Sequence, residues 1–141
     1  MNMVPFQKEH LPGVDEGWLD LVISNGPSMT GMDGDKVVFC MGLIIIKEGV
    51  AESWIQVPDP FFRTSLPHVR FILSSARKYQ DYFIRDLNLR RIAAWIRCDE
   101  PRHAAFLEKM GYQREGVMRR FERDGSDCYL YAKVKENGNG C

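Results

Sequence analysis

The chain has 141 residues, 45% of them hydrophobic, and its 19 lysines and arginines balance its 19 aspartates and glutamates. That length favours one domain that is large enough to bury a core. No apolar run reaches the roughly 18 residues that a membrane span needs, no secretory leader opens the sequence, and a net charge of zero argues against a nucleic-acid partner.

The N-terminal part of the chain predicts one helix and then three strands. Residues 1–14 contain two prolines and are expected to be irregular. Asp15 can cap a helix that ends near Ser24 and buries Trp18, Leu21 and Val22 on one face. Strands are expected at residues 28–32, 36–46 and 51–57, with turns at Asp33-Gly34-Asp35 and Lys47-Glu48-Gly49.

The second of these strands is long and rich in β-branched residues, so it should lie centrally in the sheet. Gly42 marks either a bulge or a close backbone approach. In the third strand, the two-residue alternation places Glu52, Trp54 and Gln56 on one face, and Ser53, Ile55 and Val57 on the other.

A helix follows the third strand. Thr64 or Ser65 can cap it, Pro67 is tolerated in its first turn, and the periodicity runs to about Ile84. The apolar stripe of this helix comprises Val69, Ile72, Leu73 and Ala76, together with Tyr79 or Phe83.

The C-terminal part predicts a buried strand at residues 92–96, then a short helix and a hairpin. Asp99 is expected to cap the helix and Gly111 to end it. The hairpin strands are expected at residues 115–122 and 128–134, with a turn at Asp124-Gly125. Residues 135–141 are expected to form a flexible tail.

This order of elements predicts an α/β (α+β) fold, with a mixed antiparallel and parallel central sheet flanked by helices. The helix between residues 57 and 92 makes a β-α-β crossover, which should be right-handed. We expect a single domain over residues 1–134.

The charge is unevenly distributed along the sequence. Residues 1–62 contain 3 basic and 9 acidic residues, a net −6, whereas residues 63–102 contain 9 and 4, a net +5. Ordinary surface variation accounts for such a split. So does a basic half that meets an anionic cofactor and an acidic half that meets a cationic acceptor.

The four cysteines show neither zinc-binding nor redox spacing. Cys40 and Cys128 fall in predicted strands and are expected to be buried thiols. The pattern indicates a reducing, cytoplasmic compartment and no metal site.

The C-terminal helix carries a family signature. The segment Phe106-Leu107-Glu108-Lys109-Met110-Gly111-Tyr112, followed by Glu115-Gly116-x-x-Arg119, resembles the GNAT (GCN5-related) N-acetyltransferases. In that family, the corresponding helix often has the sequence Asn-x-x-Ala-x-x-Leu-Tyr-Glu-Lys-Leu-Gly-Phe. By element order the resemblance covers about residues 36–134, and the overall pattern also resembles the GNAT-like proteins of tailed phages.

The resemblance implies acetyl-CoA as the donor. In the family, its pyrophosphate lies on backbone N–H groups where the crossover helix begins, and its pantetheine arm pairs with the preceding strand. The implied pyrophosphate residues are Arg63, Thr64, Ser65, His68 and Arg70. The implied pantetheine residues are Ile55, Gln56 and Val57.

The sequence departs from the family at this helix start. The usual signature is Arg/Gln-x-x-Gly-x-Gly/Ala, but here Thr64, Leu66 and His68 stand where glycines often stand. Pro67 also removes one N–H donor. An ordinary capped helix start fits the same residues as well as a phosphate site does.

Acetyl transfer to an amine needs a base, and Glu52 is the first candidate because the implied cofactor cleft flanks its strand. One alternative is that Glu52 is an ordinary solvent-facing glutamate of the strand. Another is that His68 is the base. Leu107 stands where many family members have a tyrosine that protonates the departing thiolate. Tyr112 is interpreted as a core aromatic with a locally bonded hydroxyl, Trp54 and Trp95 as core residues, and His10 and His103 as solvated.

Two functions remain open. One is an N-acetyltransferase acting on an amine of a small molecule or protein. The other is a catalytically degenerate GNAT-like phage virion or assembly protein, without acetyl-CoA binding, whose surface serves self-association or docking to virion proteins. The corresponding locations are the host cytoplasm and the virion.

Overall fold

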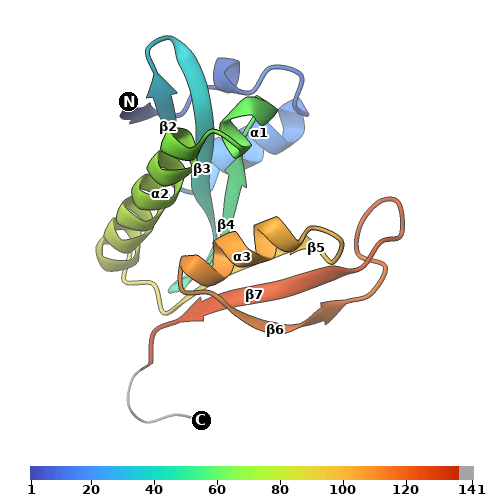
Figure 1. Ribbon diagram of the computed structural model, residues 1–141. Coiled ribbons are helices and arrows are strands. Elements are labelled where there is room, and N and C mark those ends of the chain that lie inside the picture. The colour runs from blue at the N-terminus through green and yellow to red at the C-terminus, as the bar shows by residue number, and fades with distance from the viewer. Residues whose placement is uncertain (137–141) are drawn as a thin grey trace.

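The computed structural model describes residues 1–136, which form one seven-stranded sheet with helices on its faces (Figure 1). The order in the sheet is β1-β2-β3-β4-β5-β7-β6, and only the β4–β5 pair is parallel. The strands are β1 Asn2–Pro5, β2 Ser28–Asp33, β3 Lys36–Lys47, β4 Val50–Gln56, β5 Arg91–Arg97, β6 Gln113–Met118 and β7 Cys128–Val134. The mixed sheet confirms the predicted fold class.

The helices are α1 Glu16–Ser24, α2 Leu66–Asp86 and α3 Pro101–Lys109, with short 3-10 turns at Lys8–His10 and Pro60–Arg63. Buried side chains of α2 and α3, among them Ile72 and Leu107, belong to the main core on one face of the sheet. Buried side chains of α1, Leu19 and Val22, belong to a smaller core on the other face. The sheet therefore separates two apolar layers.

β3 lies inside the sheet, as its composition predicts. Val38, Phe39 and Leu43 are fully buried. At Gly42 an added Cβ would lie 2.7 Å from the carbonyl oxygen of Pro27 and from the Trp54 ring. The expected close approach is therefore confirmed there, while the register irregularities of β3 lie elsewhere.

The N-terminal segment is more regular than predicted. Asn2–Pro5 forms β1 and pairs antiparallel with β2 at the edge of the sheet. A short edge strand tolerates a terminal proline because its outer N–H groups need no partner. The expectation of an irregular segment was therefore wrong for these residues.

α1 begins as predicted, because the Asp15 side chain accepts a hydrogen bond from the Trp18 N–H. Its buried face differs, however. Leu19 and Val22, three residues apart, are buried, whereas Leu21 is 47% exposed. Leu21 was thus wrongly assigned to the core face.

α2 starts after the N-cap Ser65, carries Pro67 in its first turn, and runs two residues beyond the predicted end. Ile72, Ala76 and Phe83 are buried as part of its apolar stripe. The buried residue between them is a glutamine, Gln80.

The C-terminal elements need two corrections. α3 has Glu100 as its N-cap, because Asp99 instead accepts hydrogen bonds from Arg97. β6 ends at Met118 rather than at residue 122, so the connection over residues 119–127 is longer than predicted. The predicted turn at Asp124-Gly125 lies within it, where the Gly125 N–H donates to the Glu122 carbonyl at 2.9 Å and Gly125 has a φ of +83°. The loop is held by an ion pair between Arg97 and Asp124 at 3.1 Å, and this side-chain closure left no signal in the strand pattern.

Two smaller predictions are confirmed. Gly111 ends α3 with a left-handed φ of +94°. Cys40 and Cys128 are buried, and burial raises the pKa of each thiol to about 11. Of the expected flexible tail, residues 135–136 belong to no helix or strand, and the Lys135 N–H donates to the Arg90 carbonyl at 2.8 Å. The rest of that segment lies outside the described residues.

Candidate functional site

The parallel strands β4 and β5 part after three residues. Their register pairs run from Val50–Arg91 to Glu52–Ala93 and stop, although both strands continue. Figure 1 shows them diverging, β4 staying beside β3 and β5 beside β7. We call the diverging segments, residues 53–56 of β4 and 94–97 of β5, the splay.

Within the splay, the edge of β4 that faces β5 has no partner strand in the described chain. The other edge of β4 stays paired with β3 as far as Gln56–Cys40. Backbone groups on such an open edge can pair with an extended ligand. Of the three residues expected to line a pantetheine arm, Ile55 and Val57 pack against the main core, and Gln56 is exposed.

The connection from β4 leads into the N-terminus of α2. The Ser65 hydroxyl does not cap this helix, and Pro67 supplies no N–H. The first turn is therefore without a side-chain cap among the described residues. Because α2 spans 21 residues, the positive end of its dipole is directed at this connection.

The predicted phosphate residues around this helix start make mostly local bonds. Arg63 Nη2 donates to the Val57 carbonyl at 3.0 Å, and the Thr64 hydroxyl donates to the Phe61 carbonyl at 3.2 Å. Arg70 is exposed, and its side chain makes no hydrogen bond or ion pair within residues 1–136. Two guanidinium groups thus lie at the surface near the start of α2.

His68 is held by two side chains. Its Nδ1 lies 2.6 Å from the Ser65 hydroxyl, and its Nε2 lies 2.8 Å from Asp33 Oδ2 at the end of β2. The hydrogen bond to His68 lowers the pKa of the Asp33 carboxyl. The structure therefore brings Ser65 and His68 together, but turns the imidazole toward Asp33. Leu66 is 58% exposed and does not fill the helix start.

Glu52 forms the last β4 pair before the splay. Its side chain is half-buried and has no hydrogen-bond or ion-pair partner among the described residues, and burial raises the pKa of its carboxyl. Alternation along β4 puts Glu52 with Trp54 on the α1 face, opposite Ser53. A carboxylate with a raised pKa and no cation beside it is suited to take up a proton.

Sequence reasoning missed a polar cluster at the base of the splay. The Tyr112 hydroxyl lies 2.9 Å from Ser53 Oγ and donates to Gln80 Oε1 at 3.0 Å. Tyr112 is buried as expected, but its bonds are long-range rather than local. The available signal was Gln80 itself, a polar residue at an apolar position of the α2 stripe.

Other side chains differ from expectation. His10 is half-buried and bonds the Thr30 hydroxyl at 2.7 Å, so it is not simply solvated. His103 is exposed and pairs with Glu100. Trp95 is 39% exposed and contacts Phe121 edge-on, so it is not a core residue. Leu107 lies in the core.

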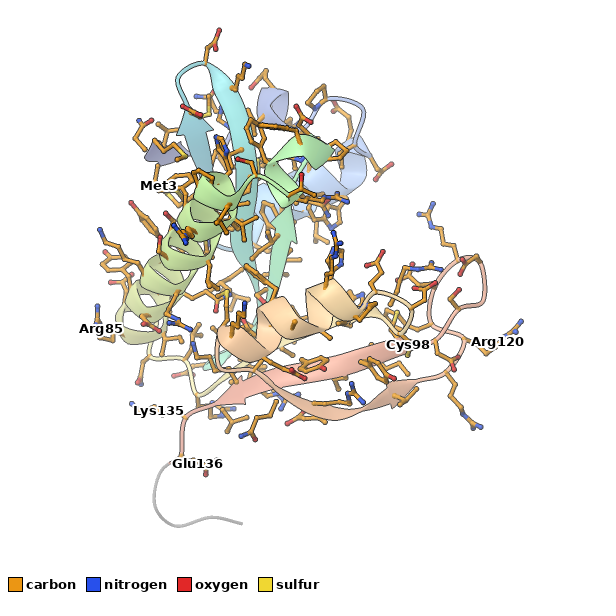
Figure 2. All side chains as sticks on the ribbon, viewed as in Figure 1. Met3, Arg85, Cys98, Arg120, Lys135 and Glu136 are labelled. Atoms are coloured by element: carbon orange, nitrogen blue, oxygen red, sulfur yellow. The ribbon has the colours of Figure 1, made fainter. Side chains whose placement is uncertain are left out.

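The described residues contain no cluster of three metal-binding side chains. None of their helices is both long and apolar enough to cross a bilayer. Two surface depressions are lined by residues outside the splay, one by Cys98 and Arg120 among others, the other by Lys135. Figure 2 shows these labelled side chains at opposite ends of the C-terminal strands.

Neither a protein-family model nor a curated protein matches the sequence. Solved structures do match. A putative phosphinothricin N-acetyltransferase superposes with a TM-score of 0.77 at 15% identity, over 96% of this chain and 99% of that chain. A chimera of the spermidine N-acetyltransferase SpeG from Vibrio cholerae and hSSAT gives 0.74 at 16% identity, over 95% and 96%.

The Vibrio cholerae spermidine N-acetyltransferase has also been solved in complex with CoA and spermine. It gives a TM-score of 0.72 at 15% identity, over 94% of each chain. At these identities the likeness concerns the fold. The chain therefore has the fold of the GNAT N-acetyltransferases, with the splayed parallel pair at its centre.

Proposed function

We propose that the chain is an acetyl-CoA-dependent N-acetyltransferase that transfers an acetyl group to an amine. The observation that carries this proposal is the splay. An open strand edge begins directly after Glu52, and the chain leaves it into a helix without a side-chain cap. One extended donor with an anionic end would use both features.

The donor would lie along β4. The backbone of Ile55, Gln56 and Val57 would pair with the pantetheine arm. The pyrophosphate would meet the first turn of α2, where Thr64, Ser65 and His68 lie, with Arg63 and Arg70 supplying positive charge. This arrangement requires Arg63 to leave the Val57 carbonyl, to which it now donates.

Glu52 would act as the base. An ammonium must lose a proton before its nitrogen can attack the thioester carbonyl, and a carboxylate does this best when its pKa lies near the working pH. Burial moves the pKa of Glu52 in that direction. Because Glu52 lies on the α1 face, the acceptor would approach from that side.

The charge distribution supports a cationic acceptor. Residues 1–62, which include α1 and Glu52, carry a net −6. Such a field attracts a protonated amine and raises its encounter rate. We infer an amine of a small molecule as the acceptor, with a protein amine as the alternative, in a reaction located in the cytoplasm.

A second candidate is a non-enzymatic protein of the same fold that works in assembly, alone or with virion proteins. Pro67 removes a donor from the helix start, and His68 is occupied by Asp33. Leu107 in the core leaves α3 without the family's tyrosine. Such a chain would not bind acetyl-CoA.

Calorimetric titration with acetyl-CoA separates the two candidates. Saturable binding at micromolar to millimolar donor, followed by release of CoA on adding spermidine, spermine or a lysine peptide, supports the enzyme. ADP and acetyl-pantetheine, each carrying one half of the donor, should compete more weakly. Absence of binding at millimolar acetyl-CoA would reject the enzyme and favour the assembly role.

A further inference from the structure

Three polar side chains from distant parts of the chain meet at the base of the splay. Ser53 belongs to β4, Gln80 to α2, and Tyr112 follows α3. The Tyr112 hydroxyl contacts both others, at 2.9 Å from Ser53 Oγ and 3.0 Å from Gln80 Oε1. We call these residues the polar trio.

The trio lies in apolar surroundings. Gln80 is 1% exposed and Tyr112 is 2% exposed, and both lie among main-core residues. Burying these polar groups is costly unless every one is bonded. An apolar stripe on α2 and a phenylalanine after Gly111 would fill the same space without that cost, so the core by itself does not require the trio.

Ser53 is the member that reaches the open edge. It is the first residue of β4 beyond the Glu52–Ala93 pair, and it is half-buried, whereas its two partners are buried. A ligand that lay along the open edge would meet the trio through Ser53.

The hydrogen bonds among the three side chains can run in either direction. In the structure Tyr112 donates to Gln80 Oε1, so the single phenol proton is used and Ser53 donates to Tyr112. If the Gln80 amide turns over, its NH₂ group donates to Tyr112 and Tyr112 donates to Ser53. The Ser53 proton is then free to face the open edge, without displacement of any backbone atom.

We propose that Ser53 donates a hydrogen bond to the negative charge that develops on the reacting thioester, and that Tyr112 and Gln80 are positioning residues that free its proton. This inference depends on the proposed acetyltransferase function. The ammonium first gives one proton to Glu52, and attack of its nitrogen forms the C–N bond and places negative charge on the carbonyl oxygen. Collapse breaks the C–S bond, the nitrogen loses its second proton to solvent, and coenzyme A leaves as a thiolate. A hydrogen-bond donor fixed beside the reacting carbonyl lowers the barrier without giving up its proton.

The ionisation of Tyr112 agrees with a donor that keeps its proton. Burial raises the pKa of Tyr112 to about 12, against the opposing effect of its bonds to Ser53 and Gln80. A coenzyme thiol, with a pKa near that of cysteine at about 8.5, is a stronger acid than this phenol. Transfer of the Tyr112 proton to the thiolate is therefore uphill, whereas a hydrogen bond through Ser53 is not.

The test compares Ser53→Ala and Tyr112→Phe with matched controls on α2. Ser75→Ala and Tyr79→Phe remove hydroxyls that are half-buried and have no hydrogen-bond partner among the described residues. Each variant is measured for acetyl-CoA affinity by calorimetry, for melting temperature, and for kcat and KM with acetyl-CoA and spermidine. Ser53→Thr, which keeps the hydroxyl, serves as the rescue.

Ser53→Ala should lower kcat about 100-fold, as loss of one such donor does, with acetyl-CoA affinity unchanged. Tyr112→Phe should lower kcat by a smaller factor, and Ser53→Thr should restore most of the loss. If Tyr112 gave up its proton in the reaction, kcat would fall at alkaline pH and Tyr112→Phe would abolish that fall. The wild type should show no such alkaline limb.

Three results would overturn the inference. They are a kcat for Ser53→Ala equal to that of Ser75→Ala, a change confined to KM and donor affinity, and an alkaline limb that Tyr112→Phe removes. A wild type that binds no acetyl-CoA would instead remove the proposed function itself, and the affinity measurement identifies that case before any variant is compared.

Discussion

The two edges of β5 differ along the same seven residues. The edge that faces β7 is paired throughout, from Arg91–Val134 to Arg97–Cys128. The edge that faces β4 is paired only as far as Ala93. We call the first the closed edge. The second faces the unpaired edge of β4 described above, and we refer to these two facing edges together as the open edge. Because the residues are the same, the difference cannot come from strand propensity.

The surroundings of β4 account for the difference. β4 stays in register with β3 as far as Gln56. From the C-terminal half of the chain, the Tyr112 hydroxyl forms a hydrogen bond with Ser53, the β4 residue at which pairing with β5 stops. Substitutions beside the closed edge should therefore change mainly stability, and substitutions beside the open edge mainly activity.

The largest effect is expected beside the closed edge, at Tyr131. This residue is fully buried, pairs with Ala94, and contacts Glu108 through its hydroxyl. Tyr131→Ala should lower the free energy of unfolding by about 3–5 kcal/mol, as large-to-small aromatic substitutions in a core do. Urea unfolding measures this, with Tyr82→Ala on the exposed face of α2 as the control. Equal losses for the two variants would show that Tyr131 does not contribute specifically to the stability of the closed edge.

At the open edge, the largest effect on activity is expected for Glu52. Glu52→Gln should lower kcat about 100-fold or more, the usual contribution of a general base, and leave acetyl-CoA affinity unchanged. Glu48→Gln in the exposed β3–β4 turn is the control. Steady-state kinetics with spermidine as the acceptor would measure both variants.

The pH dependence of Glu52 has a defined sign. Because burial raises its pKa above 4.5, the acid limb of kcat/KM should lie above that value and disappear in Glu52→Gln. The folded state binds more protons than the unfolded state between the two pKa values, so this residue's contribution to stability falls as the pH rises through that window. An acid limb that persists in Glu52→Gln would assign the base elsewhere.

On the β4 side, the open edge leads to the start of α2. Substitutions there should change acetyl-CoA binding rather than the chemical step. Arg63→Ala and Arg70→Ala should each weaken acetyl-CoA binding about tenfold, the magnitude expected for one hydrogen bond to a charged group. The exposed Arg123 of the 119–127 loop supplies the control, Arg123→Ala. Calorimetry at two salt concentrations gives the affinities, and unchanged values would show that the phosphates lie elsewhere.

Local patterns predicted most of the fold. The capped start of α1 at Asp15, the inner strand β3 and the stop at Gly111 each depend on a few neighbouring residues, and each is confirmed. β1 was missed because Asn2–Pro5 gains its regularity only by pairing with β2. The length of the 119–127 loop was missed, although its turn at Asp124-Gly125 was predicted, because Arg97 organises the loop from another strand.

The candidate site was less accessible from sequence, for the same reason. Ser53 and Tyr112 lie 59 residues apart, and His68 and Asp33 lie 35 apart. No periodicity links such pairs, whereas the helix start at Ser65 and the faces of β4 follow local rules. The one sequence clue to the trio was a glutamine in an apolar stripe.

The smallest effect is expected for the pair between His68 and Asp33, at the exit of the open edge. The Asp33 side chain is 47% exposed, so solvent screens the interaction and its contribution to stability is small. The folded pKa of Asp33 lies below its ordinary 3.8, so this contribution is present above that pH and is lost as the pH falls through the lowered value. The melting temperature of the wild type should therefore fall more steeply in acid than that of Asp33→Asn. Asp35→Asn in the turn that follows β2 should behave like the wild type. Parallel acid profiles for the wild type and Asp33→Asn would mean that His68 is not held by this contact in solution, and its imidazole would then be free to meet a phosphate without first breaking a pair.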